Sequence, residues 1–261
     1  MKRGHAMTTL PTAGPVTSPP RPPAALRMTP GRWATLAIGV PIALVLIGWS
    51  AFSLVATIGQ ASFPVSATIP VQNGRLAAST GGGDITVHQG QVSGGTARLT
   101  GTVQYSLVRP TFTVSGSGIS LHCRLPTGNC GLNATLDVPL HTAVDLTTGG
   151  GNMQVSGIQG NVTLDSSGGN VDGSGLFSPR VTTGSGGGNV TLVFTAVPDY
   201  VKISSSGGDI TIVVPGGNAS YAITSNASGG NYHSAVPTNG APRHRIQVDS
   251  GGGNISIAKA S

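Results

Sequence analysis

A turn made of Gly followed by Asn or Asp recurs seven times along this 261-residue chain, and in most copies it leads into a short run of alternating apolar and polar residues. From the second copy onward, successive turn residues are 18, 19, 20, 22 and 23 positions apart. Repetition at such a period is typical of folds that stack one small unit on the next. The seven turn residues are Asp84, Asn152, Asn170, Asn189, Asp209, Asn231 and Asn254.

The runs after these turns have the period of a β-strand. After Asp209, Ile210 and Ile212 fall on one face and Thr211 on the other. One such rung cannot bury its own apolar face, so its neighbours must cover it. We therefore predict an all-β fold, a parallel, β-helix-like solenoid of about 20-residue rungs. Roughly eight to ten rungs would make a rod of about 40–50 Å. An antiparallel sandwich stays open, because periodicity does not fix strand direction.

Three details follow from this prediction. The glycines ahead of each turn residue are expected to supply positive φ at a sharp corner. Stacking should align the Asn side chains into a hydrogen-bonded ladder. Because Asp84 and Asn152 are 68 residues apart, the segment between them is expected to hold degenerate rungs.

The composition agrees with short strands and many tight turns. The chain has 41 glycines but no strict Gly-X-Y period, which excludes collagen. A hydrophobic content of 38% argues against a wholly disordered chain. Short β-branched runs between Gly-rich turns favour an all-β domain.

The N-terminal part has the pattern of a membrane anchor. Residues 34–58 carry no charge, and a helix of that length spans a hydrocarbon core of about 30 Å. Five Lys or Arg precede it, so the positive-inside rule puts the N-terminus in the cytoplasm. We predict a disordered, basic, Pro-rich cytoplasmic tail at 1–32, a transmembrane helix at 33–59 and an extracytoplasmic domain at 60–261. A cleaved signal peptide is the alternative, and Met28 is a second candidate start.

The positive charge of the chain belongs mainly to this tail. Although the pI is near 9.9, nine Lys or Arg face eight Asp from residue 60 onward. Nucleic-acid binding requires clustered cations, and the sequence shows no cationic cluster in the β-domain. We therefore predict no nucleic-acid partner.

The stretch from Val138 to Asn170 resembles a known bacterial family. It contains Val144-Asp145-Leu146-Thr147-Thr148-Gly149-Gly150-Gly151-Asn152, and then Gly157-Ile158-Gln159-Gly160-Asn161-Val162-Thr163-Leu164. These motifs are similar to those of the putative-adhesin domain of unknown function, a β-strand-repeat family. The resemblance covers about residues 65–258 and points to the membrane-anchored actinobacterial type. It implies an adhesive or envelope-sensing domain, and it supplies no catalytic residues.

Cys123 and Cys130 enclose a turn-prone loop. Outside the membrane such a pair indicates a disulfide, which would contribute about 2.5 kcal/mol in the chain-entropy model. A redox pair is less well supported because the spacing is wider than Cys-x-x-Cys. His122 adjoins the pair, but no further metal ligands stand at suitable spacing, so we predict no metal and no cofactor.

The repeat favours neither calcium binding nor catalysis. Calcium β-rolls need a nine-residue period with Asp in each turn, whereas here only Asp84 and Asp209 are acidic. Asp165 and Asp249 hold equivalent positions, predicted four rungs or about 19 Å apart, which is too far for a glycosidase pair. Asp172 could approach Asp165 across a turn. The histidines show no pairing with a nucleophile. We predict that the protein is not an enzyme.

The hypothesis that follows is a non-enzymatic, single-pass envelope protein with an adhesive or scaffolding solenoid. Cell-wall polysaccharide or envelope proteins are the expected partners, in addition to the membrane. The alternative is an envelope-stress sensor or regulator that signals through the anchor, and a polysaccharide-active enzyme ranks third.

Overall fold

A computed structural model of the chain describes residues 60–90, 92, 94–124, 130–239 and 243–260. The predicted tail and the predicted transmembrane helix lie outside these residues. Within them, no helix combines the length and the apolar character that a membrane span requires.

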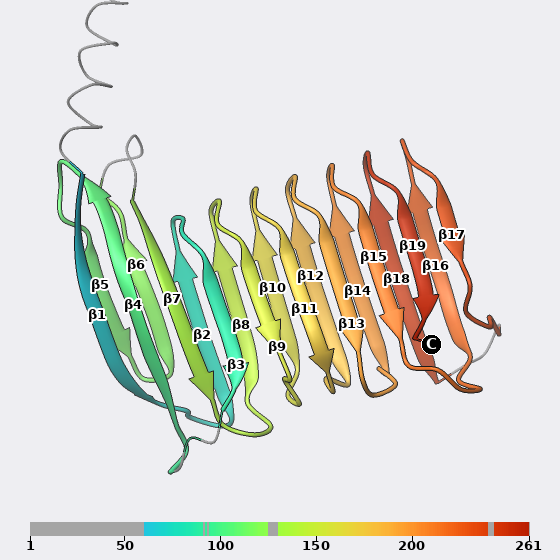
Figure 1. The fold of residues 1–261 in the computed structure, drawn as a ribbon, viewed down its shortest axis with the longest axis horizontal. Coiled ribbons are helices and arrows are strands. Elements are labelled where there is room, and N and C mark those ends of the chain that lie inside the picture. Colours follow the sequence, from blue (N-terminus) through green and yellow to red (C-terminus); the bar gives the residue numbers. More distant parts are fainter. Residues whose placement is uncertain (1–59, 91, 93, 125–129, 240–242, 261) are drawn as a thin grey trace, which may run out of the picture. The chain divides into compact units, whose positions relative to one another are not determined.

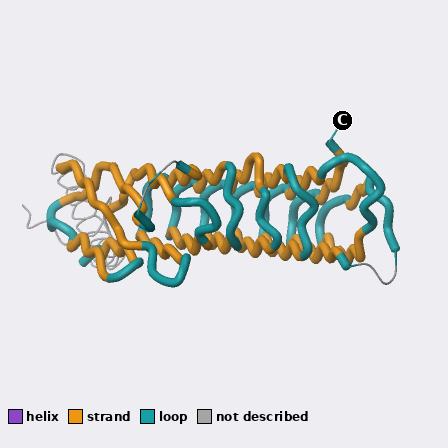
Figure 2. Tube along the Cα trace, turned by 90° about the horizontal axis from the view of Figure 1, so that it is seen from below, coloured by secondary structure: helices purple, strands orange, loops and turns teal. Residues whose placement is uncertain are grey.

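The described part is an all-β domain built from two sheets that face each other (Figures 1 and 2). The ten-stranded sheet contains, in spatial order, β1 (Gln60–Pro70), β4 (Thr96–Ser106), β7 (Cys130–Val138), β3 (Ile85–Gln89), β9 (Met153–Ser156), β11 (Val171–Leu176), β13 (Val190–Phe194), β15 (Ile210–Val214), β19 (Ile255–Lys259) and β17 (Tyr232–Ser234). The nine-stranded sheet contains β16 (Tyr221–Ala227), β18 (His244–Ser250), β14 (Tyr200–Ser205), β12 (Arg180–Ser185), β10 (Val162–Ser166), β8 (Ala143–Thr148), β2 (Arg75–Thr80), β6 (Gly118–His122) and β5 (Thr111–Ser115).

Most of the domain is a parallel solenoid, as the period of the repeat predicts. Each rung places one strand in each sheet, and equivalent strands of neighbouring rungs pair in parallel, in register except for one irregularity between Gly173 and Leu176 of β11. Inward positions alternate with outward ones, so Ile203, Ile212 and Ile257 have no exposed surface. The apolar side chains of all rungs form one continuous core between the sheets. Each rung therefore depends on its neighbours for burial.

The order of the rungs differs from the order of the sequence at both ends. Strands β2 and β3 pair directly with β8 and β9, so the turns at Asp84 and Asn152 are neighbours in space. The expectation of degenerate rungs in the intervening segment is confirmed for one rung, β6–β7, which lacks the corner glycine, but this rung does not lie between the two copies in space. The intervening segment folds outward instead, as rung β6–β7 and the antiparallel strands β4 and β5. Ile85 and Val87 stack in register on Met153 and Val155, which explains the direct contact.

At the C-terminal end, too, the spatial order of the rungs differs from their order in the sequence. Rung β18–β19 pairs with β14–β15 on one side and with β16–β17 on the other. The last strands of the chain are therefore internal, and β16–β17 forms the terminal rung. Its inward positions in β17 are Tyr232, which is 43% exposed, and Ser234. The corresponding residues of β19, Ile255 and Ile257, are buried. Placing the more apolar rung inside buries more hydrophobic surface.

The glycine before each turn residue is required by the stacking of the corners. A Cβ on Gly188 would lie 2.1 Å from the carbonyl oxygen of Gly169, and a Cβ on Gly208 would lie 2.1 Å from that of Gly188. Of this column only Gly83 has positive φ, at 89°. The expected reason, positive φ, is therefore wrong for the other copies. Backbone of one rung passes so close to the next that no side chain fits between them.

Candidate functional site

The turn residues form one continuous column along an edge of the solenoid. The side-chain Oδ1 of each, except Asn231 at the end of the column, accepts a hydrogen bond from the backbone N–H of the residue on the next rung, with N–O distances between 2.7 and 3.0 Å. The ladder thus pairs side chain with backbone. In spatial order it runs through Asn133, Asp84, Asn152, Asn170, Asn189, Asp209, Asn254 and Asn231.

Asn133 is the member of this column that sequence reasoning missed. It belongs to β7, where no Gly precedes it in the repeat pattern, because Leu132 occupies that position. Its register with Asp84 arises only from the folding back of β6–β7. The only sequence signal was an Asn followed by the alternating run Ala134–Leu136.

A second column of polar side chains runs along the inside of the corners, with one hydroxyl group in each of five rungs. Ser185 is buried, and its hydroxyl accepts a hydrogen bond from the N–H of Gly188 at 3.1 Å and donates to the carbonyl of Gly188 at 2.9 Å. The sequence carries this signal as Ser or Thr three residues before the last corner glycine. The hydroxyl groups of Thr148, Ser166, Ser205 and Ser250 likewise accept a hydrogen bond from the N–H of their own corner glycine.

Replacing Ser185 with Ala should destabilise the fold by about 1–3 kcal/mol, because it leaves the buried N–H of Gly188 without an acceptor. Chemical denaturation of the full chain measures this difference. Ser204→Ala is the matched control, since Ser204 is the exposed neighbour of a corner serine. Equal stability of the two variants would contradict the role assigned to Ser185.

The two cysteines lie at the corner of rung β6–β7. A disulfide joins Cys123 to Cys130, and it connects the strands β6 and β7. The Cys123 sulfur stands next to Gly81 of the following corner, where an added Cβ would be 3.2 Å away. The disulfide therefore lies beside the Gly-rich corner of rung β2–β3.

The carboxylates weighed for catalysis do not converge. Asp165 lies in β10 of the nine-stranded sheet and Asp172 in β11 of the ten-stranded sheet. Asp165 and Asp249 share one outer face, with Gly184 and Ser204 between them. They are three rungs apart, about 14 Å, and not four, because β16 lies outside β18.

The neighbour of Asp165 is Asp145, which sequence reasoning did not pair with it. Asp145 lies on the adjacent strand β8 and accepts a hydrogen bond from Arg75 at 3.0 Å. Partial burial, with a smaller effect of the Asp145 charge, raises the pKa of Asp165. Asp165 is exposed on the outer face of a sheet and has no cationic partner among the described residues.

The raised pKa of Asp165 predicts a pH-dependent effect. The folded state holds the proton more tightly than the unfolded chain, whose pKa is the ordinary 3.8, so ionisation of Asp165 lowers stability. This penalty is absent below about pH 3.8 and complete above the folded pKa. Asp165→Asn should therefore raise the melting temperature slightly at pH 7 and leave it unchanged near pH 3. An equal gain in melting temperature at pH 7 and near pH 3 would contradict ionisation of Asp165 as the cause of the lower stability.

No metal centre is formed by the residues that the structure describes, which contain no group of three or more candidate ligands. Asp84 and Asp209, the acidic turn residues considered for calcium, are separated by Asn152, Asn170 and Asn189 in the ladder. Their Oδ1 atoms each accept hydrogen bonds from the backbone and side chain of the next Asn.

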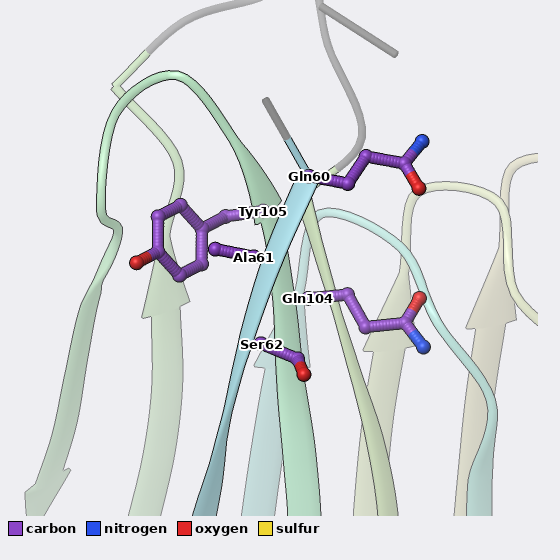
Figure 3. Close-up of a pocket in the computed structure, with 5 residues that line it drawn as sticks. All are labelled: Gln60, Ala61, Ser62, Gln104 and Tyr105. Carbon is purple, nitrogen blue, oxygen red and sulfur yellow. The ribbon is translucent and has the colours of Figure 1, made fainter. Parts of the chain in front are cut away.

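One hollow of about 210 Å³ lies at the start of β1 and the end of β4. Figure 3 shows that the amides of Gln60 and Gln104 extend on one side of these strands, whereas the Tyr105 ring extends on the other. Its polar groups therefore do not point toward a common ligand position, and none of its lining residues is charged.

The fold and its corners define a class of protein, a parallel β-solenoid with stacked Gly-(Asn/Asp) corners. The chain belongs to the Toastrack DUF4097 family, whose model matches residues 57–258. This confirms the family-level part of the resemblance, a domain of unknown function.

Two solved structures are similar to it. One is a putative cell adhesion protein from Clostridium sporogenes, 16% identical, covering 77% of this chain and 100% of that chain, with a TM-score of 0.46. The other is a putative adhesin from Bacteroides fragilis, 17% identical, covering 76% and 97%, with a TM-score of 0.42. No protein of curated function matches the sequence.

Proposed function

We propose that the protein is a non-enzymatic, membrane-anchored envelope protein whose solenoid adheres to or scaffolds envelope polymers. The observation that carries this proposal is the pair of outer sheet faces. Because outward positions of successive rungs are in register, polar side chains form straight rows in which neighbouring side chains are about 4.8 Å apart. One row contains Gln154, Asp172, Thr191, Thr211 and Ser256.

Such rows suit an extended partner. They offer many weak hydrogen bonds along one direction, and an extended polymer can engage several of them at once. Affinity then grows by multivalency rather than through one deep pocket. A polysaccharide strand with regularly spaced hydroxyl groups fits this surface, as does an exposed protein strand.

The anchor belongs to the same proposal. The uncharged segment 34–58 and the basic residues ahead of it favour a single-pass protein, with the N-terminus in the cytoplasm and residues from about 60 onward outside. The actinobacterial type within this proposal rests on the family resemblance. In this arrangement the solenoid faces the cell wall.

The test is binding of the full chain to isolated cell walls, compared with a chain in which another anchor replaces residues 1–59. An adhesin retains wall binding and its cellular function after this exchange. Loss of cellular function with retained binding would favour the sensor or regulator instead. Absence of wall binding by the unaltered chain, together with no partner in in-cell crosslinking, would contradict the proposal.

A further inference from the structure

The nine-stranded sheet gathers three cations that are far apart in the sequence. Tyr200 of β14 lies in register with Arg180 of β12 on one side and with Arg245 of β18 on the other. Lys202 points to the same outer face two residues further along β14. We call Arg180, Lys202 and Arg245 the cationic strip. The expectation that the β-domain carries no cationic cluster is therefore wrong, because positions 180, 202 and 245 become neighbours only through the stacking of the rungs.

Among the residues that the structure describes, no carboxylate forms an ion pair with the cations of the strip. The ion pairs of the described residues are Arg75 with Asp145 and His244 with Asp199, and neither includes the strip. Asp199, the carboxylate nearest to Tyr200 in the sequence, lies 3.5 Å from Nδ1 of His244. Asp249 is four residues beyond Arg245 on β18, about 13 Å along the strand. The strip therefore keeps its positive charge at one end of these strands.

Tyr200 orders part of the strip. The guanidinium carbon of Arg180 lies 5.2 Å from the centre of the Tyr200 ring, a cation–π contact. This contact restrains a long side chain that would otherwise sample many rotamers, which reduces the entropy lost on binding. Both Arg180 and Arg245 are exposed.

From this arrangement we infer a binding site for an acidic polysaccharide, an inference that rests on the proposed adhesive function. Arg180 and Arg245 are two rungs, about 10 Å, apart along the solenoid. This is similar to the length of two linked pyranose units in an extended chain. The carboxylates of such a chain can reach both guanidinium groups. Thr182 and Gln247 lie two residues further along the strands of Arg180 and Arg245, one on each side of Lys202, where they can bind sugar hydroxyls.

Nucleic acid matches the strip poorly. Duplex DNA carries one negative charge per about 1.7 Å, and binding it requires many clustered cations. Three cations spread over three strands fit a polymer of lower charge density. The charge spacing therefore favours a glycan with one carboxylate on each sugar or on every second sugar.

The experiment compares binding of the full chain to polygalacturonate, to its methyl ester and to inorganic polyphosphate. The ester has the same sugar backbone without charge, and polyphosphate has charge without sugars. We expect polygalacturonate to bind best, and its affinity to fall with added salt because the strip is exposed. Polyphosphate binding of equal strength would overturn the inference, as would no binding of polygalacturonate.

The variants locate the site. Arg180→Gln combined with Arg245→Gln should weaken polygalacturonate binding about tenfold, the order expected for two exposed ion pairs. Arg75→Gln is the matched control, because Arg75 also begins a strand of this sheet but is paired with Asp145. Equal losses in the control and the double variant would contradict the site. If the double variant still binds isolated walls like the unaltered chain, the strip is rejected while the adhesive function stands; if the unaltered chain binds no walls, the adhesive function itself fails.

Discussion

Gly188→Ala should destabilise the domain by about 3 kcal/mol or more, the upper end of the cost of overpacking. The added methyl group would lie 2.1 Å from the carbonyl oxygen of Gly169, a backbone atom on the neighbouring rung. It cannot be accommodated by a side-chain rotation, so the two corners must move apart. That movement also stretches the bond between the Asn189 N–H and Asn170 Oδ1, now 2.9 Å long. Urea unfolding and the melting temperature measure the loss.

Gly187→Ala is the matched control for this prediction. Gly187 precedes Gly188 in the same corner, its Cβ would meet no atom within 4 Å, and its φ is not positive. Alanine there restricts the unfolded chain and should change stability by less than about 1 kcal/mol, with stabilisation expected. If both variants lost the same stability, corner glycines would be needed for their flexibility and not for their lack of a side chain.

These two glycines show what the sequence can and cannot reveal. Period and alternation correctly predicted stacked rungs, because inward residues such as Ile210 and Ile212 must be covered by equivalent residues of the next rung, and of the two strand directions left open the parallel one is observed. The close approach of Gly188 to Gly169 depends on the distance between two corners, which no local pattern encodes. The sequence therefore identified the right glycines but for the wrong reason.

The candidate site was predictable only where it follows the repeat. The seven repeat-turn residues could be named in advance because each one directly precedes a strand and directly follows a corner glycine. The cationic strip could not, because Arg245 stands beside Tyr200 only when β18 is inserted next to β14. In a solenoid that followed sequence order, Ala222 of β16 would have occupied that place.

Deleting residues 243–261 tests this inserted rung, and it should cause the largest loss of stability. The deletion removes four inward side chains, Ile246, Val248, Ile255 and Ile257, which are at most 1% exposed. Burial of four such side chains stabilises a fold by about 6–12 kcal/mol, comparable to the whole stability of a typical domain. A chain lacking only Ala260 and Ser261 keeps all four and is the control.

Hydrogen exchange then distinguishes two ways in which the shortened chain can fail. If rungs stacked in sequence order, β16–β17 would keep β14–β15 as its partner, and only the last rung would be lost. In the observed order β16–β17 contacts the solenoid through β18–β19, so we expect the amides of β16 to lose protection together with the deleted strands. The three-residue strand β17, with Tyr232 and Ser234 inward, is too short and too polar to cover Ile210 and Ile212 in place of β19. Full protection of the β16 amides in the shortened chain would show that β16 pairs with β14 as well as β18 does. The greater apolar burial of β18–β19 would then not explain why this rung lies between β14–β15 and β16–β17.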